Sequence, residues 1–274
     1  MKKDHADKKY ALLLAARDSD YVLNKYGGYF NVFINALGDS DETIWDLFRV
    51  VEGEFPHEDE LSKYDGFIVS GSPYDAYGDD LWILRLCLLL QTLDSMHKRV
   101  LGVCFGHQVL CRALGGRVGK ALVGWEVGVK EVTFVEDFQQ YCPFLENIQE
   151  IPYHASIIEC HQDEVWEPPS DAKVIAYSEN IAVEAFCIED HILGIQGHPE
   201  YTKDILDNLI DRLVKNGLID MEFAEEVRKK MEAAEPDKPF TTDVGTTSHT
   251  PRALRAHYRC TGNIQGPTSV LSDA

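Results

Sequence analysis

The stretch Val100-Leu101-Gly102-Val103-Cys104-Phe105-Gly106-His107-Gln108 places a cysteine where a short apolar run ends and a helix-like pattern begins. Glycines two residues before and two residues after Cys104 allow a strand to fold sharply into a helix, so the thiol projects clear of the backbone. The N–H of Phe105 then points toward the space beside the sulfur. The pattern predicts a nucleophile turn in which Phe105 supplies one donor of an oxyanion hole.

A second apolar run ends close to a histidine and a carboxylate, in Ile192-Leu193-Gly194-Ile195-Gln196-Gly197-His198-Pro199-Glu200. A thiol is only a few per cent ionised at neutral pH, so a catalytic cysteine needs a neighbouring base and often a helix N-terminus that lowers its pKa. His198 would take the proton of Cys104 and return it to the leaving group, while Glu200 would orient the imidazole. We therefore predict a catalytic triad of Cys104, His198 and Glu200.

Each of these residues alone has an ordinary structural explanation. A free cysteine at a strand end is commonly a packing residue, a lone histidine is commonly part of a core, and a lone glutamate is commonly solvated. The glycine frame around Cys104 and the joint occurrence of all three residue types favour catalysis over packing.

Strands and helices alternate along most of the chain. Apolar runs predict strands at 10–16, 43–51, 67–70 and 100–103, and helical spacing predicts helices at 29–37, 80–97 and 202–234, the last interrupted at Gly217. This order predicts an α/β fold with a mostly parallel sheet flanked by helices, and an active site beyond the carboxyl ends of its strands. Between 118 and 186, short β-rich segments at 128–134, 156–160, 173–177 and 182–187 predict a small antiparallel β layer.

The two motifs resemble those of class I glutamine amidotransferases. Gly102 to Gln108 matches the nucleophile motif Gly-x-Cys-x-Gly-x-Gln of that family, and Gly194 to Glu200 matches its Gly-x-Gln-x-His-Pro-Glu motif. A third stretch, 65–73, resembles the family's strand ending in Ser-Gly-Gly-Pro, whose glycine N–H completes the oxyanion hole. The resemblance implies a flavodoxin-like α/β fold in which Gly71 is the second oxyanion donor.

A fourth stretch resembles a substrate-contacting segment of the same family. Glu159-Cys160-His161-Gln162-Asp163-Glu164-Val165 is similar to the family's Ser-His-x-Asp-x-Val, which lies against the α-amino and carboxylate end of the γ-glutamyl substrate. The resemblance implies substrate contacts by Cys160, His161 and Gln162, and a further contact by Gln108. As an isolated residue, Gln108 could equally cap or pack a helix.

Within this superfamily the chain most resembles the plant γ-glutamyl peptidases, which cleave the γ-glutamyl bond of glutathione and its S-conjugates. Gly197 stands where synthase-linked domains carry a bulky aromatic, and its small size predicts an open groove for a leaving group larger than ammonia. Ser72 in place of a second glycine and the segment 124–128 also look like that subgroup. The resemblance implies a stand-alone cytosolic thiol hydrolase of glutathione metabolism, without a cofactor. In plants, related enzymes also serve glucosinolate biosynthesis, but no residue of this chain identifies that pathway.

Composition excludes several functional classes. The chain has 274 residues, 45% of them hydrophobic, which suffices for a substantial core. A formal net charge of −20 argues against nucleic acid or an anionic membrane as a partner. The seven cysteines lack the spacing of a disulfide framework, which favours a reducing compartment, and neither they nor the ten histidines show a metal-binding motif. We therefore expect a cytosolic protein with no metal ion.

Neither end of the chain indicates a membrane or secretory segment. The first nine residues carry charges of both signs and precede an apolar run only one strand long, which does not fit a signal peptide. The longest apolar stretch, 81–93, is interrupted by Arg85 and Gln91 and is shorter than the roughly 20 residues that cross a bilayer.

We expect a single catalytic domain at 8–235. The polar tail at 236–274 is predicted to be disordered or poorly packed, although a docking or phosphorylation segment remains an alternative.

Three functions fit these observations. The first is a γ-glutamyl hydrolase that acts through a thioester without a partner. The second is a glutaminase subunit that supplies ammonia to a separate synthetase, since the chain itself contains no Gly-x-x-x-x-Gly-Lys-Ser/Thr segment for ATP. The third is a binding protein that has kept the fold and lost the chemistry, which the intact triad disfavours.

Overall fold

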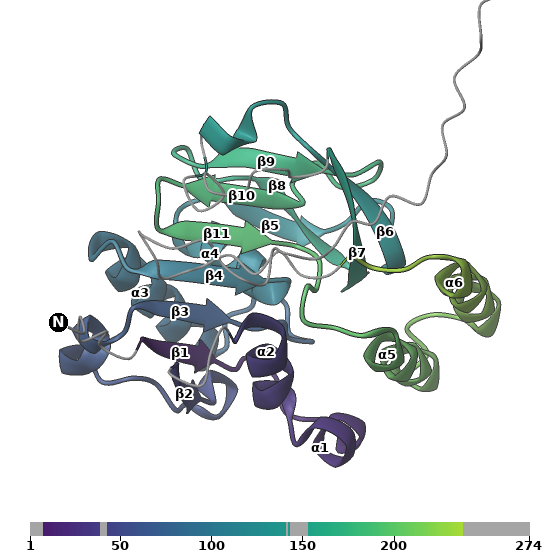
Figure 1. Ribbon diagram of the computed structural model, residues 1–274, viewed down its shortest axis with the longest axis horizontal. Helices are drawn as coiled ribbons and strands as arrows, with labels where there is room; N and C mark the ends of the chain where they lie inside the picture. Colours follow the sequence, from purple (N-terminus) through teal and green to yellow (C-terminus); the bar gives the residue numbers. More distant parts are fainter. Residues whose placement is uncertain (1–7, 39–42, 141, 143–152, 238–274) are drawn as a thin grey trace, which may run out of the picture.

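The computed structural model describes residues 8–38, 43–140, 142 and 153–237. In this part of the chain, the main sheet has nine strands in the order β2-β1-β3-β4-β11-β10-β9-β6-β7 (Figure 1). The five strands from β2 to β11 pair in parallel. They are β2 (Ile44–Phe48), β1 (Lys9–Leu13), β3 (Gly66–Val69), β4 (Arg99–Val103) and β11 (Ile192–Ile195).

The remaining four strands of this sheet pair antiparallel. They are β10 (Ala185–Ile188), β9 (Lys173–Tyr177), β6 (Glu126–Phe134) and β7 (His154–His161). The expected antiparallel segments therefore extend the parallel sheet instead of lying over it as a layer. The small separate antiparallel sheet is formed by β5 (Arg117–Lys120) and β8 (Asp163–Glu167). The α/β class and the helix-flanked, largely parallel sheet are confirmed.

Helices cover both faces of the parallel strands, because alternate side chains point to opposite faces. Ala11, Leu13 and Val69 pack on the face covered by α3 (Leu81–Ser95) and α4 (Phe105–Ala113), whereas Leu12 and Ile68 pack toward α2 (Tyr29–Leu37). In Figure 1, α3 and α4 lie behind the sheet and α2 in front of it. No helix in the described residues is long and apolar enough to cross a membrane.

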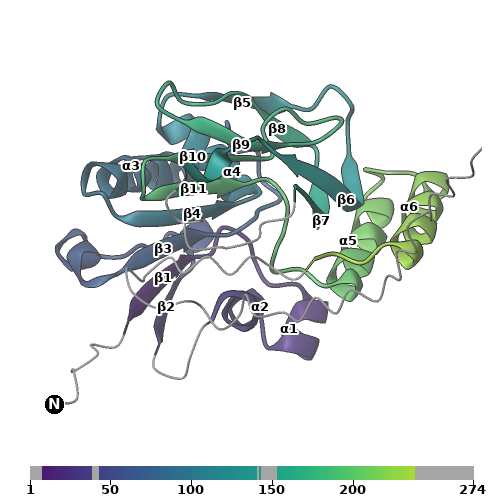
Figure 2. The ribbon, with the colours of Figure 1, turned by 45° about the horizontal axis from the view of Figure 1, so that its top comes forward.

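Two helices at the other end of the molecule cover β6 and β7. They are α5 (Lys203–Lys215) and α6 (Met221–Ala233), and Figure 2 shows them side by side beyond the antiparallel strands. The predicted break at Gly217 is confirmed, since this residue lies between the two helices at φ 68°. Three short 3₁₀ turns complete the described elements, at Val50–Glu52, Glu58–Lys63 and Phe138–Gln140.

One helix was not expected from the sequence. The polar, tyrosine-rich stretch after β1 forms α1 (Asp20–Tyr26). Its ends carry ordinary signals that identify it in retrospect: Ser19 accepts a hydrogen bond from the N–H of Val22, and Gly27 ends the helix in the left-handed conformation at φ 76°. The predicted tail at 236–274 lies outside the described residues from 238 onward.

Candidate active site

Cys104 follows the last residue of β4 and precedes the first residue of α4, as predicted. Its backbone is at φ 53° and ψ −105°, and its side chain is buried. A non-glycine residue in such a conformation costs on the order of 1 to 3 kcal/mol, a cost typical of a nucleophile turn. The strain therefore falls on Cys104 itself.

The two flanking glycines act differently from what the sequence predicted. Neither has a positive φ. A Cβ on Gly102 would lie 2.5 Å from the backbone of Gly106, and a Cβ on Gly106 would lie 2.3 Å from the carbonyl oxygen of Val69 in β3. These glycines are needed because α4 packs directly on β4 and β3, not because the backbone of either is twisted.

Gly71 follows β3 and lies between the cysteine and the histidine. A Cβ at this position would be 2.7 Å from Cε1 of His198 and 3.7 Å from Cβ of Cys104. The next residue, Ser72, fixes the loop, since its hydroxyl donates to the carbonyl of Ala15 (2.8 Å) and accepts from the N–H of Tyr74 (3.2 Å). The backbone of Gly71 is thereby held close to both reactive side chains.

His198 and Glu200 are paired as the sequence predicted. Nδ1 of His198 lies 2.8 Å from Oε1 of Glu200, and both side chains are buried. The ring of Tyr201 stacks on the imidazole with centroids 4.0 Å apart, and the N–H of His198 donates to the carbonyl of Ile158 in β7. Glu200 holds the imidazole at Nδ1, and Tyr201 covers one face of the ring. The other ring nitrogen, Nε2, is left available for proton transfer.

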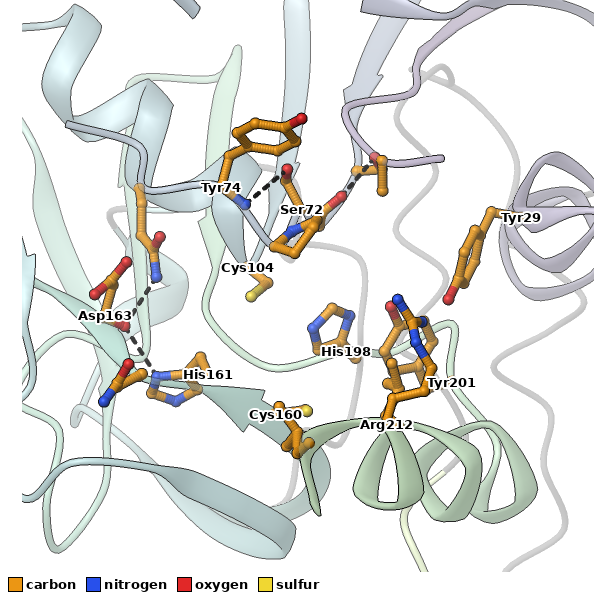
Figure 3. A pocket seen from close by; sticks show the side chains of 18 of the residues that line it. Tyr29, Ser72, Tyr74, Cys104, Cys160, His161, Asp163, His198, Tyr201 and Arg212 are labelled. Atoms are coloured by element: carbon orange, nitrogen blue, oxygen red, sulfur yellow. Dashed lines mark hydrogen bonds between the residues drawn. The ribbon is translucent and has the colours of Figure 1, made fainter. Parts of the chain in front are cut away.

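The parallel pairing of β4 with β11 brings the two motifs together. Val103 is opposite Ile195, and the N–H of Cys104 donates to the carbonyl of Ile195 at 2.9 Å. Three neighbouring strands, β3, β4 and β11, therefore deliver Gly71, Cys104 and His198 to one edge of the sheet. Figure 3 shows Cys104 and His198 facing the same cavity.

Burial dominates the electrostatics of the Cys104 thiol. Burial raises the pKa of Cys104, and the nearby carboxyl groups of Glu159 and Glu200 raise it further, whereas the N–H of Phe105 beside the sulfur lowers it. Desolvation of the thiol therefore outweighs the opposing effect of the helix N-terminus on its pKa. The raised pKa favours the neutral form of the thiol.

The cavity beside Cys104 has a volume of about 380 Å³ and is lined by all four residues expected to contact a substrate, namely Gln108, Cys160, His161 and Gln162. Two of them are also tied to the protein interior. The amide of Gln108 donates to the carbonyl of Asp163 (2.8 Å) and to Oε1 of Gln196 (3.0 Å). Nδ1 of His161 donates to the same carbonyl at 2.9 Å (Figure 3). These two side chains form a preorganised wall of the cavity.

The groove expected beside Gly197 is not present. A Cβ at Gly197 would lie 2.4 Å from Oε1 of Glu159 and 2.8 Å from Cγ2 of Ile157. The space left by the missing side chain is therefore filled by the buried carboxyl of Glu159. Burial raises the pKa of Glu159 to about 8, and its Oε2 lies 3.3 Å from Nε2 of His161.

One group of side chains outside the cavity brings potential metal-ligand atoms together in the described part of the chain. His97, Glu189 and His191 have such atoms within 4.8 Å of one another. They lie before the starts of β4 and β11, so they are at the opposite ends of these strands from Cys104. This group takes no part in the arrangement around the thiol.

Comparison with known proteins agrees with the motifs. Residues 25–221 match the model of the family described as glutamine amidotransferase class-I. The chain belongs to this family. It is 50% identical to Gamma-glutamyl peptidase 5 of Arabidopsis thaliana over 231 residues, which cover 84% of this chain and 91% of that protein. Gamma-glutamyl peptidase 3 of the same plant is 48% identical over 84% of this chain and 92% of its own length.

The fold is shared with solved structures of the family. A glutamine amidotransferase from Thermotoga maritima superposes with a TM-score of 0.61 at 20% identity, covering 84% of this chain and 94% of that one. At this identity the likeness concerns the fold alone.

Sequence analysis missed two residues of the site. Tyr201 follows the predicted triad directly and stacks on its histidine, but it belongs to neither motif. Arg212 lines the cavity from α5, more than one hundred residues after the nucleophile, and only the packing of α5 brings it there.

Proposed function

We propose that this chain is a cysteine-dependent γ-glutamyl hydrolase that cleaves the γ-glutamyl bond of glutathione or its S-conjugates through a γ-glutamyl thioester. One observation carries the proposal: a strained, buried Cys104 shares one cavity with a His198 that is held by Glu200. The names of the relatives that are 48 to 50% identical support the choice of the γ-glutamyl bond.

Acylation begins with the neutral thiol. Nε2 of His198 accepts the proton of Cys104 as the sulfur attacks the γ-carbonyl carbon, and the C=O electron pair moves onto oxygen. The oxyanion is bound by the N–H groups of Gly71 and Phe105. The tetrahedral intermediate collapses when the C–N bond breaks and His198 gives its proton to the leaving amine.

In deacylation, water takes the place of the thiol as the nucleophile, and Cys104 becomes the leaving group. Water enters after the amine has left, His198 accepts a proton from it, and the resulting hydroxide attacks the thioester carbon. Collapse breaks the C–S bond, releases glutamate and returns the proton to Cys104. Glu200 stabilises the imidazolium in both halves of the reaction. No step requires a cofactor, a metal ion or a second protein, and the free thiol suits the reducing cytosol.

The cavity wall supplies the glutamyl subsite in this proposal. Cys160, His161 and Gln162 border the cavity where β7 ends and β8 begins, and Gln108 faces them from α4. Because Gln108 and His161 already bond to the interior, they provide a fixed surface for the glutamyl end of the substrate.

Release of glutamate by the purified chain alone tests the proposal. Glutathione, a glutathione S-conjugate and glutamine are compared side by side, with Cys104→Ala as the control. We expect glutamate from both glutathione compounds and none with the variant. Activity on glutamine alone, or only after a second protein is added, would instead support a glutaminase subunit that supplies ammonia to a synthetase.

A further inference from the structure

The cavity contains a cation whose charge no acidic group of the site balances. Three long basic side chains line the cavity: Arg17, Lys120 and Arg212. Lys120 lies 2.9 Å from Asp163, and Arg17 lies 3.7 Å from Glu52. Among the residues that the structure describes, no carboxylate lies within 4.0 Å of Arg212.

Acidic side chains outnumber basic ones in this chain, 46 to 26, and yet none of the described carboxylates pairs with Arg212. Arg212 is solvent-exposed on α5, and its helix packs against β7. Its charge lowers the pKa of Tyr29, although burial has the larger effect and raises it. The guanidinium therefore lies beside the Tyr29 hydroxyl, with which it shares a hydrogen bond, and no described carboxylate occupies its remaining N–H groups.

The position of Arg212 indicates which end of the proposed substrate lies near it. In Figure 3, Asp163 and His161 lie on one side of Cys104, whereas Arg212 and Tyr29 lie on the other, beyond His198. The leaving amine must lie at His198, which donates its proton. In the proposed reaction, a peptide that leaves at His198 and extends away from the glutamyl subsite points toward Arg212.

We propose that Arg212 binds the terminal carboxylate of the peptide leaving group and so selects γ-glutamyl peptides over glutamine. This inference rests on the proposed function. A guanidinium binds a carboxylate through two parallel N–H···O bonds, a geometry that lysine cannot reproduce. Glutamine releases ammonia, which carries no carboxylate, so Arg212 contributes nothing to its binding.

The test compares substrates with and without this carboxylate. Glutathione, its glycine ethyl ester and glutamine are assayed with the full chain and with Arg212→Ala, Arg212→Lys and Lys215→Ala. Lys215 is an exposed cation on the same helix that does not line the cavity. We expect Arg212→Ala to lower kcat/KM for glutathione about 10- to 100-fold, the usual range for a charge-assisted contact.

The remaining substrates and variants distinguish carboxylate binding by Arg212 from a purely structural role of this residue. The ester and glutamine should change less than about threefold in Arg212→Ala, Arg212→Lys should recover only part of the loss, and Lys215→Ala should resemble the wild type. Equal losses on glutathione and its ester would overturn the proposal.

A binding measurement distinguishes this inference from the proposed function. Glutathione is titrated calorimetrically into Cys104→Ala and into Cys104→Ala/Arg212→Ala, neither of which turns over. Binding that is about 10-fold or more weaker in the double variant supports the role of Arg212 even if the wild type cleaves another bond. Equal affinities would exclude it, whatever hydrolysis the wild type performs.

Discussion

The backbone of Cys104 carries a strain that suits its proposed role as the nucleophile. At φ 53° and ψ −105° the residue holds its thiol at the start of α4, beside the N–H of Phe105. Only glycine adopts such angles at little cost, but glycine has no nucleophile. Two other residues of the site are determined by close packing. Gly71 leaves room for the ring of His198, and the buried carboxyl of Glu159 fills the space beside Gly197.

Replacing Cys104 by glycine should stabilise the chain relative to replacing it by alanine. Relief of strain of about 1 to 3 kcal/mol offsets the entropy cost of glycine, which is about 0.5 to 1 kcal/mol. We expect Cys104→Gly to unfold with a free energy equal to that of Cys104→Ala or up to about 2 kcal/mol above it, measured in urea. Both variants should be inactive. A glycine variant clearly less stable than the alanine variant would contradict the assignment of strain.

A methyl group at Gly71 should impair catalysis by displacing the base. The added Cβ would lie 2.7 Å from Cε1 of His198, so the ring must move. A displacement of about 1 Å typically costs about 100-fold in rate, and we expect a loss of at least that size in kcat for Gly71→Ala. Gly53→Ala is the control, because the Cβ added there would meet nothing within 4 Å, although the φ of 86° at Gly53 makes alanine unfavourable for stability. Similar losses of activity in both variants would argue against the placement of Gly71.

The buried carboxyl of Glu159 should make the protein less stable as pH rises. Its pKa is about 8 in the folded chain, so the unfolded chain loses this proton from about pH 4.5 upward while the folded chain retains it. Stability therefore falls between these two values. We expect Glu159→Gln to reduce the decline in Tm between pH 5 and pH 8, and the exposed Glu225→Gln to leave it unchanged. Parallel Tm curves for Glu159→Gln and wild type would rule out the raised pKa.

At the scale of elements, the site depends on how closely α4 packs on the sheet. The helix contacts β3, β4 and β11 on one side and β5 and β8 on the other, so it links the two sheets. The close contact of α4 with β3 and β4 requires glycine at positions 102 and 106. It places the N-terminus of α4 at the carboxyl ends of the parallel strands. The position of Cys104 is precise because the residue lies at the junction of a strand and a helix, two rigid elements.

An added methyl group at Gly106 should push α4 away from β3. Its Cβ would lie 2.3 Å from the carbonyl oxygen of Val69, and overpacking of this kind costs about 1 to 3 kcal/mol. We expect Gly106→Ala to lower both the free energy of unfolding and kcat. Gly115→Ala, after the end of the same helix, should lose stability through its positive φ of 94° and retain kcat. Full activity in Gly106→Ala would show that the contact is not needed.

At the scale of the whole molecule, the hydrophobic clusters of the described residues lie between Tyr10 and Met231. The last described residues close onto the fold, because the N–H of Asp237 donates to the carbonyl of Ser156 and its carboxylate accepts from the N–H of Ser156. The core clusters and the cavity of the described residues are thus formed by residues before Asp237.

A chain ending at Asp237 should therefore fold and react like the full chain. We expect its Tm to differ by less than about 2 °C and its kcat/KM for glutathione to be unchanged, because no contact of the core or cavity described above is removed. The comparison needs only a melting curve and the glutamate assay. A lower Tm or a lower rate would show that residues 238–274 contribute to the domain.

The sequence by itself determined the fold class, the turn at Cys104 and the pairing of His198 with Glu200. It could do so because short glycine-framed motifs and strand–helix alternation are local properties of the chain. Packing decided the rest: the raised pKa of Cys104, the filling of the space beside Gly197 by Glu159, and the antiparallel strands joining the main sheet. Packing also brought Arg212 and Tyr201 to the cavity. Desolvation and close approach depend on residues far apart in the chain, so only the tertiary structure reveals them.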